Sequence, residues 1–306
     1  MRHLLTLEDL ARDELISLLD AAQALRPQAL RRSAHRPLRG LTVANLFFEP
    51  STRTRASFQL AAERLGADVL NFEAESSSTR KGETLVDTLR NLEAMGASLF
   101  VVRHSHGSVP ASLAAAAAPA SGVVSAGDGR HAHPTQGLLD MLTIRQKKGE
   151  DFSRLSVAIV GDIRHSRVAR SGAEALRILG VRDLRLAAPY TLMPESDDPS
   201  FTGAPRIDAL YTALEGCDVV MMLRLQRERM DEGLVSSLEE YYRDWGLSPE
   251  RLALAKPDAI VLHPGPMNRG VEIADAVADG PQSVILEQVS NGVAVRMAVL
   301  ERLAQR

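Results

Sequence analysis

Short apolar runs alternate with helical patterns along most of this chain. The apolar runs lie at residues 41–48, 68–72, 98–103, 122–125, 155–160, 184–187, 219–223 and 259–262. Between them, apolar residues recur every three or four positions, which is the spacing of a helix with one buried face. A regular order of strand and helix favours parallel sheets with helices on both faces. We therefore predict an α/β protein.

The length of 306 residues is enough for two domains of ordinary size. The two series of strands are separated by Lys147-Lys148-Gly149, and we expect the domains to join near residues 135–150. In folds of this class, ligands bind beyond the carboxyl ends of the strands. The residues that directly follow each strand are therefore the first candidates for function.

Composition excludes several classes of protein. The net charge of -3 argues against general nucleic-acid binding, which normally needs a basic excess. We see no apolar stretch long enough to span a membrane and no signal peptide, so we expect a cytoplasmic protein. The single cysteine, Cys217, rules out an intramolecular disulfide and a cysteine-based zinc site. We expect Cys217 to be a buried core residue.

The first predicted strand ends in Glu49-Pro50-Ser51-Thr52-Arg53-Thr54-Arg55, where a helical pattern begins. Hydroxyls and backbone N–H groups at a helix N-terminus suit a phosphate. Arg53 can add a charge-assisted contact to the phosphate oxygens. A helix cap with surface arginines is the plainer interpretation, but three hydroxyls interleaved with two arginines are uncommon at such a turn.

The string FFEPSTRTRASF at residues 47–58 resembles the carbamoyl-phosphate signature of the transcarbamylase family, and the likeness extends over essentially the whole chain. The resemblance implies two Rossmann-like domains, each a parallel sheet flanked by helices, with the C-terminal helix packed back on the first domain. We expect residues 1–140, with the C-terminal helix at 285–306, to form a carbamoyl-phosphate-binding domain. Residues 141–284 are expected to form an aspartate-binding domain.

The resemblance also assigns residues to carbamoyl phosphate. Arg103 ends a predicted strand where the family has a phosphate and carbonyl ligand, and HPTQ at 133–136 follows GDG as in the family. The resemblance implies that His133 contacts the carbamoyl oxygen and that Gln136 contacts the carbamoyl nitrogen. In the His-Pro-x-Pro element, the backbone of Gly265 and Pro266 would hold the carbamoyl amide and the attacking amine. Pro266 is expected to follow a cis bond. The full set implied for carbamoyl phosphate is Ser51, Thr52, Arg53, Thr54, Ser77, Lys81, Arg103, His133, Gln136, Gly265 and Pro266.

The loop Ser76-Ser77-Ser78-Thr79-Arg80-Lys81 is similar to the mobile serine–lysine loop of the family. The resemblance implies that Ser77 and Lys81 enter the active site of the neighbouring subunit in a homotrimer. Three adjacent serines leave open which of them does so. Without the resemblance, a solvated loop before a helix is the simpler interpretation.

The second predicted domain lacks the G-x-G-x-x-G fingerprint of a dinucleotide site after its first strand, so a nicotinamide cofactor is not expected. In this domain, Arg167 resembles the family's aspartate-binding arginine. Arg224 and Gln226 resemble the pair that holds the amino-acid substrate. The resemblance implies that Lys81 of the neighbouring subunit also binds aspartate. Arginines suit the two carboxylates of aspartate, whereas ornithine would need acidic partners. The related ornithine enzymes usually carry His-Cys-Leu-Pro, and this chain has no cysteine near Pro264.

The implied reaction transfers the carbamoyl group of carbamoyl phosphate to L-aspartate, a step of pyrimidine biosynthesis, with no cofactor and no metal. Arg53, Thr54, Arg103 and His133 are the candidate catalytic residues. Assembly with regulatory or dihydroorotase chains is compatible with the resemblance. Two alternatives stay open: a transcarbamylase acting on ornithine or a modified amino acid, and an inactive scaffold that serves assembly.

Overall fold

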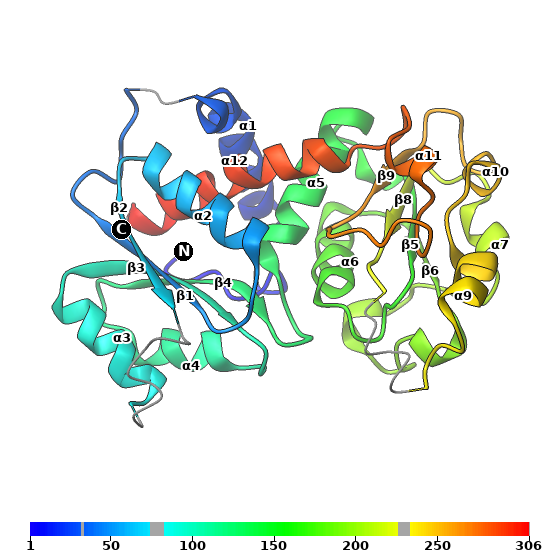
Figure 1. Ribbon diagram of the computed structural model, residues 1–306. Helices are drawn as coiled ribbons and strands as arrows, with labels where there is room; N and C mark the ends of the chain where they lie inside the picture. The colour runs from blue at the N-terminus through cyan, green and yellow to red at the C-terminus, as the bar shows by residue number, and fades with distance from the viewer. Residues whose placement is uncertain (32–33, 74–82, 226–232, 306) are drawn as a thin grey trace. The chain divides into compact units, whose positions relative to one another are not determined.

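The computed structural model describes residues 1–31, 34–73, 83–225 and 233–305. Its chain divides into two compact units, shown in Figure 1. Unit 1 comprises Met1–Leu139 and Ser290–Arg306, and unit 2 comprises Asp140–Val289. We predicted domain boundaries after residues 140 and 284; the boundaries between the two units lie after Leu139 and after Val289.

Unit 1 is built on a four-stranded sheet in the order β2-β1-β3-β4, with every pairing parallel. The strands are β1 (Thr42–Phe47), β2 (Asp68–Glu73), β3 (Ala97–His104) and β4 (Gly122–Asp128). Successive side chains of a strand point to opposite faces. Both faces are mostly apolar, as expected where helices cover each of them, although Asn45 and Ser125 are also buried.

Figure 1 shows α3 (Leu85–Ala94) and α4 (Val109–Ala116) on one side of this sheet, and α1 (Arg12–Leu30) and α2 (Thr52–Arg64) on the other. A cluster of buried apolar side chains lies beneath α3 and α4. It includes Ala44, Leu46, Leu89, Phe100, Val102, Leu113 and Val123.

The C-terminal helix α12 (Ile285–Ala304) belongs to unit 1 from Ser290 onward. Its Arg302 donates to the Ser17 hydroxyl of α1 at 2.7 Å, and the Arg296 guanidinium lies 5.1 Å from the centre of the Phe58 ring of α2. The predicted return of the terminal helix to the first domain is therefore confirmed.

Unit 2 contains a five-stranded parallel sheet in the order β7-β6-β5-β8-β9. The strands are β5 (Ser156–Val160), β6 (Asp183–Ala187), β7 (Arg206–Ile207), β8 (Val219–Met222) and β9 (Ile260–Leu262). Residues 157–160 of β5 and all of β8, at the centre of the sheet, are continuous apolar runs, as expected for a parallel sheet buried on both faces.

Figure 1 shows α6 (Arg167–Leu179) on one side of this sheet, with α7 (Leu210–Leu214) and α10 (Pro249–Leu252) on the other. The other helices in the described ranges are α5 (Pro134–Lys148), which continues from unit 1, α9 (Leu238–Trp245), α11 (Asp275–Ala278), and the short η3 (Phe152–Arg154), η4 (Tyr190–Leu192) and η5 (Pro199–Phe201). The predicted α/β fold with two parallel sheets is confirmed.

Cys217 is fully buried two residues before β8, as predicted for a core residue. Its thiol donates to the Ala213 carbonyl oxygen at 3.0 Å, and burial raises the pKa of Cys217 to about 11. Among the helices that the structure describes, none combines the length and the apolar character needed to cross a bilayer.

Candidate active site

The predicted phosphate loop joins β1 to α2 in unit 1. Ser51 is the N-cap residue of α2, but its side chain makes no capping hydrogen bond. Thr52 and Arg53 are exposed, whereas Thr54 is buried on the inner side of the first turn. The first N–H groups of a helix have no partner within the helix. This turn therefore offers backbone donors, hydroxyls and a guanidinium in one place, which suits an anion.

Arg103 lies beside this loop, at the end of the neighbouring strand β3. It is in register with Phe47 of β1, and the Phe48 N–H donates to the Arg103 carbonyl oxygen at 2.9 Å. The side chain is only 11% exposed. Its Nη1 donates to the Ala126 carbonyl oxygen at 3.1 Å, and its Nη2 forms an ion pair with Glu49. Contacts on both nitrogens fix the plane of the guanidinium at the carboxyl edge of the sheet.

His133 and Gln136 stand where β4 passes into α5. Both side chains are buried, and the Gln136 N–H donates to the His133 carbonyl oxygen at 2.9 Å, which starts the helix. A tight turn precedes them: the Asp128 N–H donates to the Ala132 carbonyl oxygen at 2.9 Å. The turn needs Gly129, because φ is +51° and a Cβ there would lie 2.9 Å from the Gly107 nitrogen.

The histidines near Arg103 were given no role by the sequence. The His104 ring packs between Phe48 and His106, with ring centres 5.5 and 5.4 Å away. Burial and the neighbouring His106 ring lower the pKa of His104. Glu49, which orients Arg103, was also missed, although its place directly before the phosphate loop was a signal.

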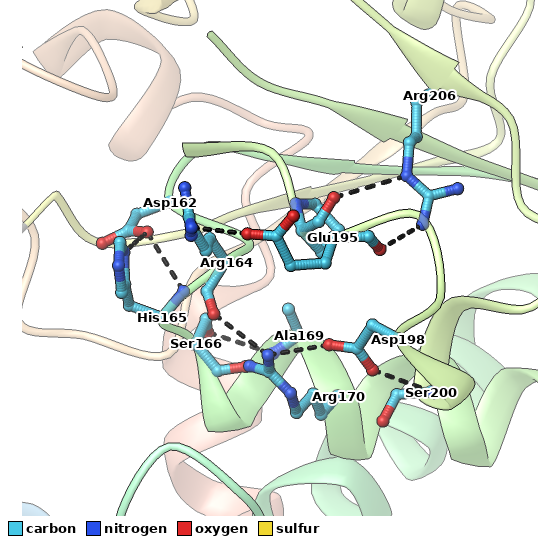
Figure 2. A network of polar contacts seen from close by, with 11 residues as sticks. Asp162, Arg164, His165, Ser166, Ala169, Arg170, Glu195, Asp198, Ser200 and Arg206 are labelled. Carbon is cyan, nitrogen blue, oxygen red and sulfur yellow. Dashed lines mark hydrogen bonds and ion pairs between the residues drawn. The ribbon is translucent and has the colours of Figure 1, made fainter. Parts of the chain in front are cut away.

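In unit 2, a loop of residues 161–166 joins β5 to α6 and presents Arg167, the first residue of that helix. Asp162 accepts from the His165 N–H at 3.3 Å, and its Oδ1 lies 2.7 Å from the His165 Nδ1 (Figure 2). Ser166 caps α6 by accepting from the Ala169 N–H at 3.1 Å. The loop is thus held at both ends by its own side chains.

Arg170 holds the same loop from the first turn of α6. It donates to the carbonyl oxygens of Arg164 at 3.0 Å and Ser166 at 3.4 Å, and to Asp198 Oδ2 at 2.8 Å (Figure 2). A cation at a helix N-terminus is unfavourable unless an anion lies near it. Asp198 supplies that anion for Arg170. Sequence reasoning missed Arg170, although two arginines in one first turn, without an acidic residue, were a signal.

Arg224 follows β8, the strand next to β5. The Leu223 N–H donates to the Val160 carbonyl oxygen at 2.8 Å, and Arg224 itself is exposed. The Tyr241 side chain of α9 is buried, and burial raises the pKa of its hydroxyl, with Glu272 and Asp162 adding to the effect.

The loop after β9 contains a cis peptide bond between Gly265 and Pro266, as predicted. Asn268 in this loop donates from Nδ2 to the Leu225 carbonyl oxygen at 2.7 Å. The loops after β9 and β8 are therefore bonded to each other. Since β5, β8 and β9 are neighbours in the sheet, one edge of unit 2 carries Arg167, Arg224 and the Gly265–Pro266 backbone.

The predicted site residues thus form two described sets. Ser51, Thr52, Arg53, Thr54, Arg103, His133 and Gln136 lie at the carboxyl edge of the unit 1 sheet, and Arg167, Arg224, Gly265 and Pro266 at that of unit 2. Ser77, Lys81 and Gln226 lie outside the described residues. Within the described ranges, no three histidine, cysteine, aspartate or glutamate side chains are grouped so as to hold a metal ion.

Comparison with known families matches both units. Residues 2–146 match the aspartate/ornithine carbamoyltransferase carbamoyl-P binding domain, and residues 153–303 match the Asp/Orn binding domain of the same family. The chain belongs to the aspartate/ornithine carbamoyltransferase family. The resemblance to this family that we inferred from the sequence is thereby confirmed.

Curated relatives cover nearly the full length. The aspartate carbamoyltransferase catalytic subunit of Stenotrophomonas maltophilia (strain R551-3) is 62% identical over 305 residues, which is 99% of this chain and 96% of that protein. The catalytic subunit of Xanthomonas campestris pv. campestris (strain B100) is 62% identical over 304 residues, with the same shares covered.

Solved structures of both kinds of carbamoyltransferase match this chain. Aspartate transcarbamoylase from Trypanosoma cruzi, in complex with carbamoyl phosphate and aspartate, has a TM-score of 0.87 and 30% identity, covering 98% of this chain and 96% of that one. Ornithine carbamoyltransferase from Thermus thermophilus also has a TM-score of 0.87, with 26% identity, covering 100% and 99%. The fold therefore does not distinguish the two amino-acid substrates; the residues must.

Proposed function

We propose that this chain transfers the carbamoyl group of carbamoyl phosphate to the amine of L-aspartate, giving N-carbamoyl-L-aspartate and phosphate for pyrimidine biosynthesis. The observation that carries the choice of amino acid is the pair of arginines, Arg167 and Arg224, at one edge of unit 2. Two guanidinium groups complement the two carboxylates of aspartate and would repel the cationic side chain of ornithine. The relatives at 62% identity, named aspartate carbamoyltransferase, support the same choice.

In this proposal, unit 1 binds carbamoyl phosphate. The phosphate receives the N–H groups at the start of α2, the hydroxyls of Ser51, Thr52 and Thr54, and the Arg53 guanidinium. The positive end of the helix dipole adds to the attraction. Arg103, His133 and Gln136 contact the carbamoyl group. The buried positions of Arg103 and His133 support this role, because a dry environment strengthens a charge-assisted hydrogen bond.

Unit 2 receives the amino acid. Arg167 stands at the N-terminus of α6, where a carboxylate is also favoured by the helix dipole. Arg224 and Gln226 also bind aspartate. The backbone at Gly265 and Pro266 binds the carbamoyl amide and the attacking amine.

The reaction proceeds by attack of the neutral aspartate amine on the carbamoyl carbon. A carbon–nitrogen bond forms, the carbon–oxygen bond to phosphate breaks, and a phosphate oxygen accepts the amine proton. Thr54, Arg103 and His133 polarise the carbonyl and stabilise the negative charge that develops on its oxygen. Arg53 stabilises the departing phosphate. Catalysis then rests on positioning and fixed charge, without a covalent enzyme intermediate.

An assay with each amino acid tests the substrate. The purified chain with carbamoyl phosphate should form carbamoyl-aspartate from aspartate and no citrulline from ornithine. Citrulline formation would instead favour the ornithine alternative, to which the shared fold lends some support. A folded oligomer that forms neither product would favour the scaffold.

We further propose a cytoplasmic homotrimer with shared active sites, in which Ser77 and Lys81 act in the neighbouring subunit. The term catalytic subunit in the names of the relatives supports assembly and is compatible with regulatory or dihydroorotase chains as further partners. Lys81 would bind both substrates, since a single ammonium can reach phosphate and carboxylate oxygens.

Mixing two inactive variants tests the shared site. Lys81→Ala and His133→Ala trimers should each be nearly inactive. In a mixed cyclic trimer, one interface pairs a chain that keeps His133 with a neighbour that keeps Lys81. Random reassembly of equal amounts should then restore about one site in four. No recovery, with mixed trimers verified by native mass, would show that each chain supplies both groups to its own site.

A further inference from the structure

Two fully buried side chains, His263 and Glu272, hold the loop that follows β9 at two points. The Gly265 N–H donates to His263 Nδ1 at 2.8 Å, and the Asn268 N–H donates to Glu272 Oε1 at 2.6 Å. The two side chains also contact each other, with His263 Nε2 at 3.1 Å from Glu272 Oε1. Both side chains are 0% exposed. We call this pair the His263–Glu272 clamp.

The hydrogen bonds define the tautomer of the histidine. A backbone N–H can only donate, so His263 Nδ1 must accept from Gly265. The ring proton is therefore on Nε2, where it is donated to Glu272 Oε1. Glu272 Oε1 receives two donors, one from the imidazole ring and one from the loop backbone. The clamp works only while an acceptor occupies that position.

The clamp is anchored to the rest of unit 2 on the side of α12. The His263 N–H donates to Gln288 Oε1 at 2.9 Å, and Gln288 Nε2 donates to Asp140 Oδ1 at 2.7 Å. All three side chains are buried. The start of the loop is thus attached to Gln288 of α12 and, through it, to Asp140 of α5, both of which belong to unit 2.

On its other side, the clamp reaches the amino-acid half of the candidate site. Asn268, whose N–H is held by Glu272, donates from Nδ2 to the Leu225 carbonyl oxygen at 2.7 Å. Leu225 directly follows Arg224. The same buried carboxylate therefore controls the loop at Gly265 and Pro266 and, through Asn268, the chain at Arg224.

We propose that His263 and Glu272 are positioning residues for the carbamoyl transfer, which hold the backbone at residues 264–266 and the Arg224 segment in the geometry that the amino-acid substrate requires. This inference rests on the proposed function. Neither side chain needs to touch a substrate. A displacement of about 1 Å in groups that orient reactants can lower a rate by about 100-fold. Loss of the clamp should thus affect the amino acid and leave phosphate binding unchanged.

Two substitutions at position 272 separate the hydrogen bonds from the charge. Glu272→Leu removes the acceptor at similar volume and leaves two buried donors unpaired. Glu272→Gln keeps an oxygen at the Oε1 position and loses only the charge, so it should restore most of the activity. Asp218→Leu is the control: Asp218 is also buried, accepts from the Ser156 N–H at 3.0 Å and pairs with Lys256, but it precedes β8, at the opposite end from Arg224.

Steady-state kinetics and calorimetry provide the readouts. Calorimetry uses inorganic phosphate and N-(phosphonacetyl)-L-aspartate, both of which are bound in structures of the T. cruzi enzyme. For Glu272→Leu we expect kcat/KM for aspartate to fall about 100-fold and the phosphonacetyl compound to bind at least about 10-fold more weakly, with phosphate affinity within about twofold. For Glu272→Gln and Asp218→Leu, we expect kcat/KM for aspartate and the affinities for the phosphonacetyl compound and for phosphate to stay within about threefold of the wild-type values.

The tautomer gives an independent check. Nitrogen-15 spectra of histidine-labelled protein should show His263 protonated on Nε2 and bare on Nδ1 in the wild type and in Glu272→Gln. If Glu272→Leu fails to fold, Asn268→Ala takes its place, because it removes only the link to Leu225. It should raise KM for aspartate about 10-fold without changing phosphate affinity.

The inference is overturned if folded Glu272→Leu keeps wild-type constants, if Asp218→Leu loses aspartate affinity to the same degree, or if the proton is on Nδ1. Failure of the proposed function gives a different result, since the wild type itself would then form no carbamoyl-aspartate. In that case the kinetic constants of the same variants are measured with the amino acid that the wild type does use. If the variants and the wild type then have equal constants, the role of the clamp is still rejected.

Discussion

The carboxyl edges of the two sheets present their functional side chains in different ways. In unit 1, Thr52 and Arg53 are exposed at the start of α2, and Ser51 does not use its side chain to cap the helix. In unit 2, the loops after β5 and β9 are held by side-chain bonds, from Arg170 to carbonyl oxygens at residues 164 and 166 and from Glu272 to the Asn268 N–H.

Under the proposed function, the difference follows from what each edge would bind. A helix N-terminus attracts a phosphate through backbone N–H groups that the helix itself holds in place, so few further supports are needed. An arginine on a loop loses conformational entropy when it engages a carboxylate. Holding the loop before the substrate arrives reduces that cost. We therefore expect substitutions in unit 1 to act mainly on kcat, and those in unit 2 mainly on KM for the amino acid.

The largest effect is expected for Arg103→Met in unit 1. Methionine keeps much of the volume but removes the donors that would stabilise charge on the carbamoyl oxygen. Loss of one such donor lowers kcat by about 100- to 1000-fold. Steady-state kinetics at saturating substrates measure this value.

Arg185→Met is the control for Arg103→Met. Arg185 also pairs with a carboxylate, that of Asp183, and donates to two carbonyl oxygens, those of Ala213 at 3.1 Å and Glu215 at 2.7 Å. It belongs to β6 in unit 2 and has no proposed role in the reaction. An equal fall of kcat in both variants would mean that Arg103 acts through stability alone.

A smaller effect is expected for Arg224→Ala in unit 2. A hydrogen bond to a charged group contributes about 1.5–3 kcal/mol. KM for aspartate should therefore rise about 10- to 150-fold, while KM for carbamoyl phosphate stays within about twofold. Arg243→Ala, which removes an exposed arginine of α9 paired with Asp244, should change neither constant. A large change in KM for carbamoyl phosphate would contradict the division of roles between the units.

The sequence was sufficient to predict residues at the ends of strands. Arg103, His133 and Arg167 all lie where an apolar run passes into a helical pattern, and the structure has them at strand ends or helix starts. The α/β class followed from the same alternation. Strand β7 was not predicted, because its two residues, Arg206 and Ile207, are too few to show periodicity.

Residues that hold a site residue or a site loop in position could not be predicted in this way. Arg103 and Glu49 are 54 positions apart, and Asn268 and Leu225 are 43 apart. Such pairs meet only after the sheet has brought the loops of neighbouring strands together. Their side chains carry no local pattern, since a buried glutamate and a surface glutamate look alike in a sequence. The supports of a site are therefore harder to predict than the groups they orient.

The smallest effect on activity is expected for Gly161→Ala, which tests the packing against Leu223, the residue before Arg224. Gly161 has a φ of +122°, and a Cβ there would lie 3.2 Å from the Leu223 Cβ and 3.3 Å from the Tyr241 hydroxyl. Backbone strain of this kind costs about 1–3 kcal/mol. Urea unfolding should show a loss of stability in that range, and displacement of Leu223 should raise KM for aspartate severalfold.

Gly180→Ala separates backbone strain from side-chain contact in this prediction. Gly180 also has a positive φ, +92°, but a Cβ there would meet nothing within 4 Å. It ends α6, far along the helix from Arg167. Gly180→Ala should therefore lose stability and keep its KM for aspartate. If both alanine variants change KM equally, or if neither does, the packing of Gly161 against Leu223 and Tyr241 has no part in positioning Arg224. A rise of KM in Gly161→Ala alone would mean that unit 2 needs its loops held in place, as the comparison with unit 1 requires.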